Sequence, residues 1–315
     1  MSRYRIAALL ALLIAFPLAA NHWDQSFYVS FASRILIYAI AATSLNLILG
    51  YGGMISFGHA AYLGAGAYTV GILMQEGVAS AWIAWPAAIV TAGLSAAIIG
   101  AICLRTRGVY FIMITLAFAQ MMYYVFVSLR SYGGEDGFTL ARRSTTGLGL
   151  DLKNDLTFYY IVLALLICAI VLMRRLTQAR FGGVLNGIRE NETRMQAIGF
   201  PTYRYKLLAF VIAGAAAGLA GALLANQNAF VSPSVLHWSQ SGTLMIMVIL
   251  GGVGQLYGGA LGAAVYLILE EVLSSHTVHW QFALGIVLLT VVLYAPKGIA
   301  GLFAQRRLRG RAAGG

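Results

Sequence analysis

Charged residues are scarce in this sequence. Asp, Glu, Lys and Arg make up 10% of the 315 residues, while 60% are hydrophobic and the mean hydropathy is +0.80. A water-soluble globule of this size needs far more polar surface to cover it. The shortage of charge excludes that class and predicts that lipid surrounds most of the chain.

Motifs for metal binding and for ATP hydrolysis are also lacking. The two cysteines, Cys103 and Cys168, lie inside apolar runs without CxxC spacing, so the sequence suggests neither a disulfide framework nor a zinc site. A Walker A loop needs Gly-Lys followed by Ser or Thr, but the three lysines follow Leu, Tyr and Pro. We therefore expect no metal or ATP on this chain, and any ATP-driven activity requires a separate ATPase.

Charges inside the apolar runs are nearly absent. Arg34 is the exception, but it lies early in its run and can extend outward toward Asp24. Because a charge in mid-bilayer costs about 2.5–3.5 kcal/mol on insertion scales, intramembrane charges usually mark function. Their scarcity argues against a proton relay or an ion-coupled transporter.

Long apolar runs occupy most of the chain. A membrane-spanning helix needs roughly 20 mostly apolar residues. Such runs lie at about 6–20, 30–50, 59–75, 80–104, 109–129, 156–174, 207–226, 242–270 and 280–295. We predict a single all-α, polytopic membrane domain over 1–315, with about eight transmembrane helices plus a Gly-broken hairpin at 242–270, or 8–10 spans. Residues 1–20 form either an uncleaved anchor or a signal peptide.

The distribution of Arg and Lys sets the predicted orientation, because cytoplasmic loops are rich in both. Basic residues gather at 105–107, in a loop at 174–206 and in a tail at 305–315. The loop at 130–155 has balanced charges and 227–241 has none, so both should face outward. We expect both termini in the cytoplasm, and we attribute the net charge of +11 to topology rather than to nucleic-acid binding.

Two Gly-rich breaks resemble each other, one at 49–58 and one at 250–259. Paired interruptions of this kind point to a translocation path, because broken backbone is tolerated at membrane depth only where protein or a water-filled cavity satisfies it. The alternative is that glycine merely loosens two turns. The predicted path residues are Asn46, Gly50, Gly52, Gly53, Ser56, His59, Gly251, Gly252 and Gly254.

Small residues recur every four positions at Gly214, Gly218 and Ala222, which predicts closely packed helices.

A short amphipathic helix is predicted over 187–199. Glu190 and Arg194 are four residues apart, and apolar Ile188, Met195 and Ile198 fall near one face. Gly199 should end the helix, which would suit a groove on a partner protein or the lipid headgroups.

Catalytic and metal sites find little support. Ser56 and His59 are three residues apart, but no acidic residue follows to orient the histidine and no GxSxG elbow surrounds the serine. His276 and His279 lie at a predicted outer membrane edge, where polar side chains are ordinary. We predict no catalytic residue and no metal site.

Several motifs together resemble one family. They are the segment from Ser44 to Ala61, the Gly-Glu-Asp-Gly turn at 134–137, the segment 188–199, the segment from Tyr205 to Gly221, and Gly251 to Gly254. The sequence resembles the permease subunits of branched-chain amino acid (LIV-type) ABC importers, and the LivM-like more than the LivH-like members. The resemblance spans roughly residues 35–300.

The resemblance implies a multi-pass subunit of the bacterial inner membrane that forms half of a path for branched-chain amino acids. Its implied partners are a second related permease, two cytoplasmic ATPases that hold ATP and Mg, and a periplasmic or lipid-anchored binding protein. The outer loops would receive that binding protein, and 187–199 would couple to an ATPase. The coupling residues would be Arg189, Glu190, Asn191, Glu192, Arg194, Ala197 and Gly199.

Three alternatives remain. Related permeases carry urea or short amides. A self-sufficient facilitator or channel could use the Gly breaks without ATP. An intramembrane enzyme would need Ser56 and His59.

Overall fold

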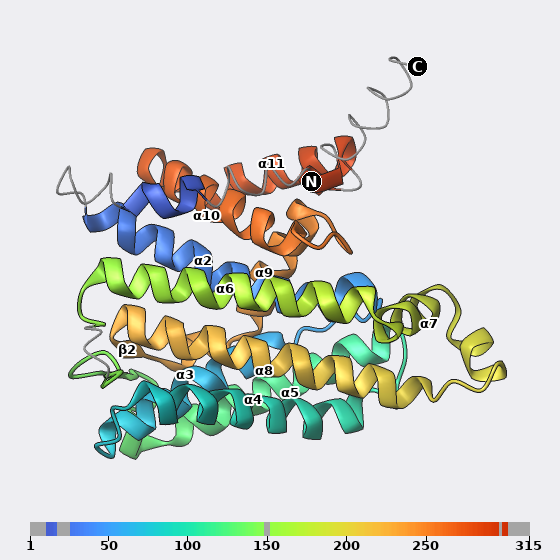
Figure 1. The fold of residues 1–315 in the computed structure, drawn as a ribbon, viewed down its shortest axis with the longest axis horizontal. Helices are drawn as coiled ribbons and strands as arrows, with labels where there is room; N and C mark the ends of the chain where they lie inside the picture. The colour runs from blue at the N-terminus through green and yellow to red at the C-terminus, as the bar shows by residue number, and fades with distance from the viewer. Residues whose placement is uncertain (1–10, 18–25, 148–151, 296–297, 302–315) are drawn as a thin grey trace.

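The chain folds into a bundle of helices with one small pair of strands (Figure 1). The computed structural model describes residues 11–17, 26–147, 152–295 and 298–301. The main helices are α2 (Ser26–Asn46), which continues into the π-helix η1 (Leu47–Tyr51), α3 (His59–Gln75), α4 (Ala81–Cys103), α5 (Val109–Ser128), α6 (Asp155–Gln178), α7 (Arg180–Ala197), α8 (Thr202–Asn228), α9 (Trp238–Gly251), α10 (Gly258–His276) and α11 (Trp280–Tyr294).

The described helices confirm an all-α, polytopic membrane protein. Six of them are long and apolar enough to cross a membrane: α2 with η1, α4, α5, α6, α8 and α10. The apolar helices α9 and α11 are shorter, and α3 has 17 residues. Residues 11–17 are helical, while the rest of the first predicted run and the basic tail at 305–315 lie outside the described residues.

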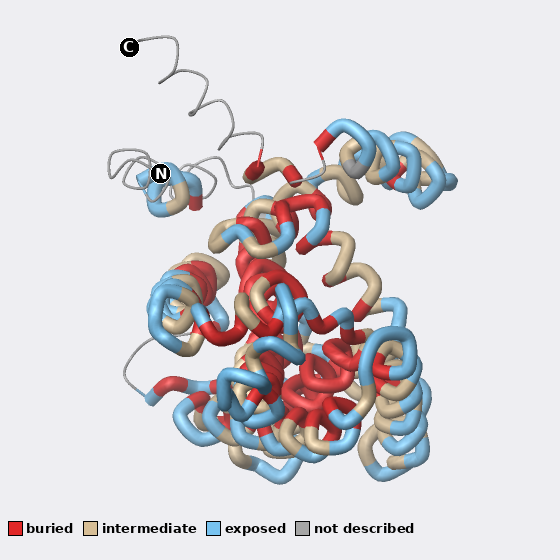
Figure 2. Tube along the Cα trace, turned by 90° about the vertical axis from the view of Figure 1, so that its right-hand side faces the viewer, coloured by how far each residue is buried: buried red, intermediate tan, exposed pale blue. Residues whose placement is uncertain are grey.

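Small residues bring α3, α4 and α8 close together. Buried residues concentrate in the interior of the bundle (Figure 2). A Cβ added to Gly218 of α8 would overlap the Ala92 side chain of α4, and one added to Gly66 of α3 would overlap the Gly218 backbone. A Cβ on Gly221 would overlap the Leu63 carbonyl of α3. The predicted stripe of small residues in α8 is therefore confirmed, and it packs against two helices at once.

The predicted break near Gly251 divides α9 from α10. Gly251 lies against Gly258, and Gly262 lies against Met247, so the two helices pack antiparallel around the short turn at 252–257. Gly252, with φ +121°, is the residue after α9, a conformation that favours glycine. Residues 242–270 therefore leave and return at the same end of the bundle, as predicted.

The two ends of the bundle differ in their chemistry. At one end lie the two loops that the charge pattern predicts to be on the same side of the membrane. They contain four short elements: η2 (Arg130–Tyr132), β1 (Phe138–Thr139), β2 (Phe230–Val231) and η3 (Pro233–Leu236). β1 and β2 pair antiparallel, with Phe138 opposite Val231. At the other end, α7 leaves the bundle between α6 and α8 (Figure 1). The strand pair and α7 therefore mark opposite ends.

Arginines near the ends have partners within the fold. Arg143 forms an ion pair of 2.7 Å with Asp155 and lies over the Phe158 ring, which ties the loop at 130–155 to the start of α6. The Arg34 guanidinium carbon lies 5.8 Å from the centre of the Tyr38 ring. The expected partner of Arg34, Asp24, is outside the described residues.

We predict that Gly221→Ala lowers the free energy of unfolding by about 1–3 kcal/mol, because the added methyl group overpacks the α3 backbone. Equilibrium unfolding of the purified chain in mixed micelles measures the loss. Gly285→Ala in α11 is the matched control, since a Cβ there meets nothing within 4 Å. Equal effects of the two substitutions would contradict the packing described here.

Candidate functional site

The first Gly-rich break follows a change in helix type. α2 ends at Asn46 and continues as the π-helix η1, whose last turn is closed by a hydrogen bond of 3.2 Å from the Gly52 amide to the Leu47 carbonyl. Short π-helical turns are rare and occur often at functional sites. Residues 52–58 then run without regular helix until α3 begins at His59. The broken segment predicted from the sequence is therefore present.

The two breaks meet at one place. A Cβ on Gly50 would overlap the Gly254 amide nitrogen and the Asn46 side chain. The Asn46 side chain accepts a hydrogen bond of 2.9 Å from the Gly254 amide and donates one of 2.7 Å to the Gln255 carbonyl. We call Asn46, Gly50, Gly53 and Gly254 the glycine junction. It joins backbone segments about 200 residues apart in the chain.

In the part of the chain that the structure describes, the side chains of Ser56 and His59 form no hydrogen bond with the glycine junction. His59 is fully buried, and its Nε2 lies 2.8 Å from Ser44 Oγ. Ser56 Oγ accepts a hydrogen bond of 3.1 Å from the Gly58 amide, and Ser241 Oγ accepts one of 2.8 Å from the Ala60 amide. Within the described residues, Ser56 and His59 form no hydrogen bond with each other. Their hydroxyl and imidazole groups instead hold the start of α3 in place.

The helix predicted over 187–199 differs from the observed one. α7 is interrupted at Asn191, which has extended φ and ψ angles of −158° and 97°. The Asn191 side chain accepts a hydrogen bond of 2.9 Å from the Arg194 amide, so Asn191 acts as the N-cap of a second helical segment. Gly199, with φ +88°, ends this segment in a Schellman motif, with bonds from Gly199 and Phe200 to the Gln196 and Met195 carbonyls.

The interruption separates residues that a continuous helix would align. Ile188 is buried at 5% exposure, whereas Ile198 is 64% exposed, so they do not share a face. Among the described residues, no ion pair joins Glu190 to Arg194. The predicted i,i+4 pair is therefore wrong, because Asn191 changes the direction of the helix between its two members.

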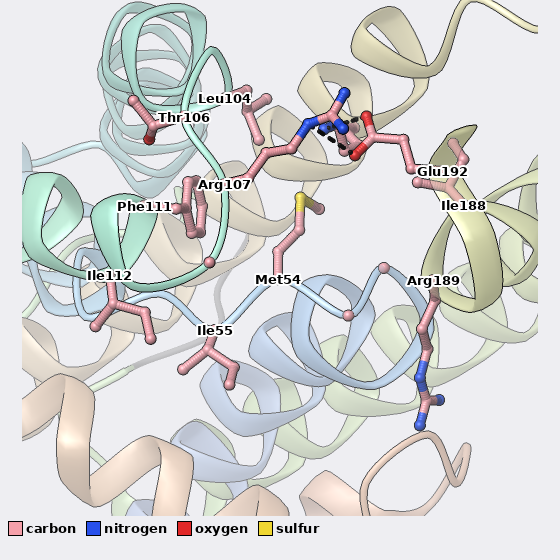
Figure 3. A pocket seen from close by; sticks show the side chains of 14 residues that line it. Met54, Ile55, Leu104, Thr106, Arg107, Phe111, Ile112, Ile188, Arg189 and Glu192 are labelled. Atoms are coloured by element: carbon pink, nitrogen blue, oxygen red, sulfur yellow. Dashed lines mark ion pairs between the residues drawn. The ribbon is translucent and has the colours of Figure 1, made fainter. Parts of the chain in front are cut away.

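Arg189 points into the protein body at the glycine junction. Its Nη1 donates a hydrogen bond to the Gly50 carbonyl, and its side-chain stem packs against Gly53. Figure 3 shows the side chain directed away from Glu192 and toward the turn between α9 and α10. Of the residues predicted to couple to a partner, Arg189 is thus the one in contact with the predicted path.

A cluster of charges holds α7 against the bundle. Glu192 forms an ion pair of 2.6 Å with Lys206 at the start of α8 and one of 3.5 Å with Arg107 in the α4–α5 loop. The Lys206 side chain is 8% exposed, whereas that of Arg107 is 61% exposed. Thr202 Oγ1 also donates to Glu192, over 3.2 Å. Glu192 therefore joins three segments of one end of the protein.

A pocket of about 210 Å³ lies between this charged cluster and the glycine junction (Figure 3). Four charged residues contribute to its walls: Arg107, Arg189, Glu192 and Lys206. The apolar part comes from Met54, Ile55, Leu104, Phe111, Ile112 and Ile188. The pocket is thus bounded by α7 on one side and by the first break on the other.

The structure brings together only some of the predicted residues. Asn46, Gly50, Gly53, Gly254 and Arg189 meet at the glycine junction. Gly52 lies beside Met54, and Gly251 and Gly252 shape the α9–α10 turn. Apart from Glu192, the remaining predicted coupling residues are exposed, close to the interruption of α7 or after it: Glu190, Asn191, Arg194, Ala197 and Gly199. Within the described residues, no group of three His, Cys, Asp or Glu side chains could hold a metal ion.

The family described as the branched-chain amino acid transport system permease component matches residues 27–295. The chain belongs to this family. It is therefore a LivM-like permease subunit of the ABC transporter class, a transport protein rather than an enzyme, and a multi-pass membrane protein that works with other subunits.

Three curated relatives are similar over most of the permease, and each is named a branched-chain amino acid transport permease LivM. The Escherichia coli K12 relative is 26% identical over 334 residues, which cover 98% of this chain and 78% of the relative. The Salmonella typhimurium relative is 25% identical, over 93% and 74% of the two chains. The Methanocaldococcus jannaschii relative is 24% identical, over 84% and 90%. No solved structure matches the permease significantly.

Sequence reasoning missed the internal roles of Lys206, Arg107 and Ser44. The two basic residues looked like topology signals, since both lie in clusters near apolar ends. Nothing in the sequence spacing places Glu192 between them. The Asn191 cap did have a signal, because Asn is a preferred N-cap residue and an acidic residue follows it.

We predict that Glu192→Gln destabilises the permease by about 3 kcal/mol, because it leaves the buried Lys206 ammonium without its ionic partner. Arg107→Gln should cost at most about 1 kcal/mol, since that pair is mostly exposed. Thermal unfolding of the purified permease measures both. The double variant E192Q/K206M should recover part of the loss, and a double variant less stable than E192Q alone would contradict the assignment.

Proposed function

We propose that this permease forms half of the translocation path of an ATP-driven importer for branched-chain amino acids. Its partners are a second related permease, two cytoplasmic ATPases that hold ATP and Mg, and a periplasmic or lipid-anchored binding protein. The location is the bacterial inner membrane. Family membership supports this proposal, and the observation that carries it is the position of α7, which leaves the bundle and also reaches the glycine junction.

The charge distribution supports an orientation with α7 in the cytoplasm. Arg107 of the α4–α5 loop lies next to α7, so two basic segments occupy the same end of the permease. The strand pair at the other end contains β2, which carries no charged residue. Since cytoplasmic loops carry the excess of Arg and Lys, the α7 end faces the ATPases and the strand end faces the binding protein.

The second segment of α7 is suited to seat in a groove of an ATPase. Its side chains at Arg194, Ala197 and Ile198 are exposed, and Ile198 adds an apolar contact at 64% exposure. The Asn191 cap and the Gly199 motif close both ends of this segment, so it can keep its shape when it docks. The ion pairs of Glu192 then connect the docked segment to α8 and to the α4–α5 loop.

The walls near the breaks suit apolar substrates. Met54 and Leu250 are buried beside the glycine residues, and side chains of Ile48 and Leu47 are buried in η1. The Arg143–Asp155 ion pair lies at the strand end of the bundle, and the two ion pairs of Glu192 lie on the α7 side of the pocket that Met54 also lines. Such walls accept Leu, Ile and Val and do little to select among them, which leaves selection to the binding protein.

We predict that the tagged permease co-purifies from its native membrane with a second polytopic protein and with ATPases that contain Walker motifs. Mass spectrometry identifies the recovered proteins, and the co-purified binding protein identifies the substrate class. Recovery of the permease alone, still active in liposomes, would contradict the importer and favour a facilitator. A binding protein selective for urea or short amides would overturn the substrate and keep the mechanism.

A pair of variants tests the docking surface. Ile198→Asp should reduce ATPase recovery at least tenfold, because it places a charge in an apolar contact. Val278→Asp is the matched control, since Val278 is 92% exposed in the turn between α10 and α11 and is remote from α7. If Ile198→Asp retains the ATPases as fully as Val278→Asp, this segment is not the docking surface.

A further inference from the structure

Arg189 contacts the backbone of the permease itself, which a residue that served only to contact an ATPase would not need to do. It lies in the last turn before the interruption at Asn191, on the segment of α7 that packs against the bundle. The residue is exposed as a whole, yet its guanidinium reaches back to the Gly50 carbonyl. Glu192, three residues later, faces the other way toward Lys206 (Figure 3).

Its contacts involve both breaks. The hydrogen bond ends on Gly50, in the last turn of the π-helix. A Cβ on Gly53 would lie 2.9 Å from the Arg189 Cγ, so the stem fits only because residue 53 has no side chain. A Cβ on Gly254 would lie 3.3 Å from the Arg189 Nη1 and 3.2 Å from the Gly50 carbonyl. The guanidinium therefore lies beside the contact between the two breaks.

The chemistry of this position favours arginine. Carbonyls at the end of a helix lack an intrahelical partner, and at membrane depth each such group requires one. A planar guanidinium can donate to the Gly50 carbonyl and still lie flat between glycine backbones, which a compact ammonium group does less well. Positive φ angles of +66° at Gly53 and +76° at Gly254 further restrict both neighbours to glycine.

We propose that Arg189 is a positioning residue that transmits movement of α7 to the glycine junction, so that both breaks move when the ATPases move α7. The proposal rests on the function proposed above. In this role Arg189 acts through the backbone of the permease itself rather than by direct contact with an ATPase. Arg194 and Ile198 belong to the exposed segment, whereas Arg189 connects that segment to the predicted path.

The test uses the complete complex in lipid nanodiscs and follows hydrogen–deuterium exchange with and without ATP and Mg. In the wild type, ATP should change the exchange of peptides from α7 and of peptides covering 47–57 and 250–258. In Arg189→Gln, α7 should still respond, while the response at the two breaks should fall at least threefold. Arg180→Gln is the matched control, because Arg180 is exposed in the same helix and its side chain has no partner among the described residues.

Transport provides a second measurement. With leucine as the probe, Arg189→Gln should retain its ATPases and hydrolyse ATP, while leucine carried per ATP falls at least tenfold. Gly53→Ala should disturb the same contact, so the double variant should be no worse than the poorer single variant. Should the Arg189→Gln permease fail to fold, Arg189→Lys replaces it, with an intermediate response at the breaks expected.

Several outcomes would overturn the proposal. One is a variant in which the two breaks respond to ATP as they do in the wild type. The variant is Arg189→Gln, or Arg189→Lys if it has replaced Arg189→Gln. Another is loss of the ATPases from an otherwise folded Arg189→Gln complex, which would make Arg189 a docking residue. Additive losses for Arg189→Gln and Gly53→Ala would also overturn it. A wild-type α7 that does not respond to ATP would instead contradict the proposed importer, and this is visible without any variant.

Discussion

The backbone contact between Gly50 and Gly254 constrains the rest of the structure. A Cβ on Gly50 would overlap the Gly254 backbone, and Gly254 has a positive φ angle that favours glycine. The Asn46 side chain, from the first segment, forms hydrogen bonds with the Gly254 amide and the Gln255 carbonyl of the second. Exposed backbone groups at membrane depth are unfavourable unless protein or water satisfies them. Asn46 and Arg189 provide such partners, so an interruption of two helices becomes a stable feature.

Close helix packing in other parts of the bundle keeps the two segments in contact. Gly218 and Gly221 let α8 approach α3, while the α9–α10 hairpin places Gly254 beside the end of α2. At the α7 end, Glu192 fixes the helix to α8 by its ion pair with Lys206. α7 is therefore attached to the bundle at two places, by charges to α8 and by Arg189 to the breaks.

The helical class, the broken hairpin and the small-residue stripe followed from the sequence, because apolar length and glycine spacing report on local backbone. The contact between the breaks could not be predicted, since the spacing of Asn46 and Gly254 carries no information about their proximity. The direction in which the Arg189 side chain points could not be predicted either. It depends on the interruption at Asn191, where a local cap competes with a continuous helix pattern.

The most direct test of the glycine junction is hydrogen–deuterium exchange of the turn at 252–257 in Asn46→Leu, measured on the permease alone in nanodiscs. We predict at least tenfold faster exchange than in the wild type, because the Gly254 amide loses its acceptor. Asn186→Leu, at a position whose side chain forms no hydrogen bond within the described residues, should leave the turn unchanged. Unchanged exchange in Asn46→Leu would contradict a contact between the two breaks held by this side chain.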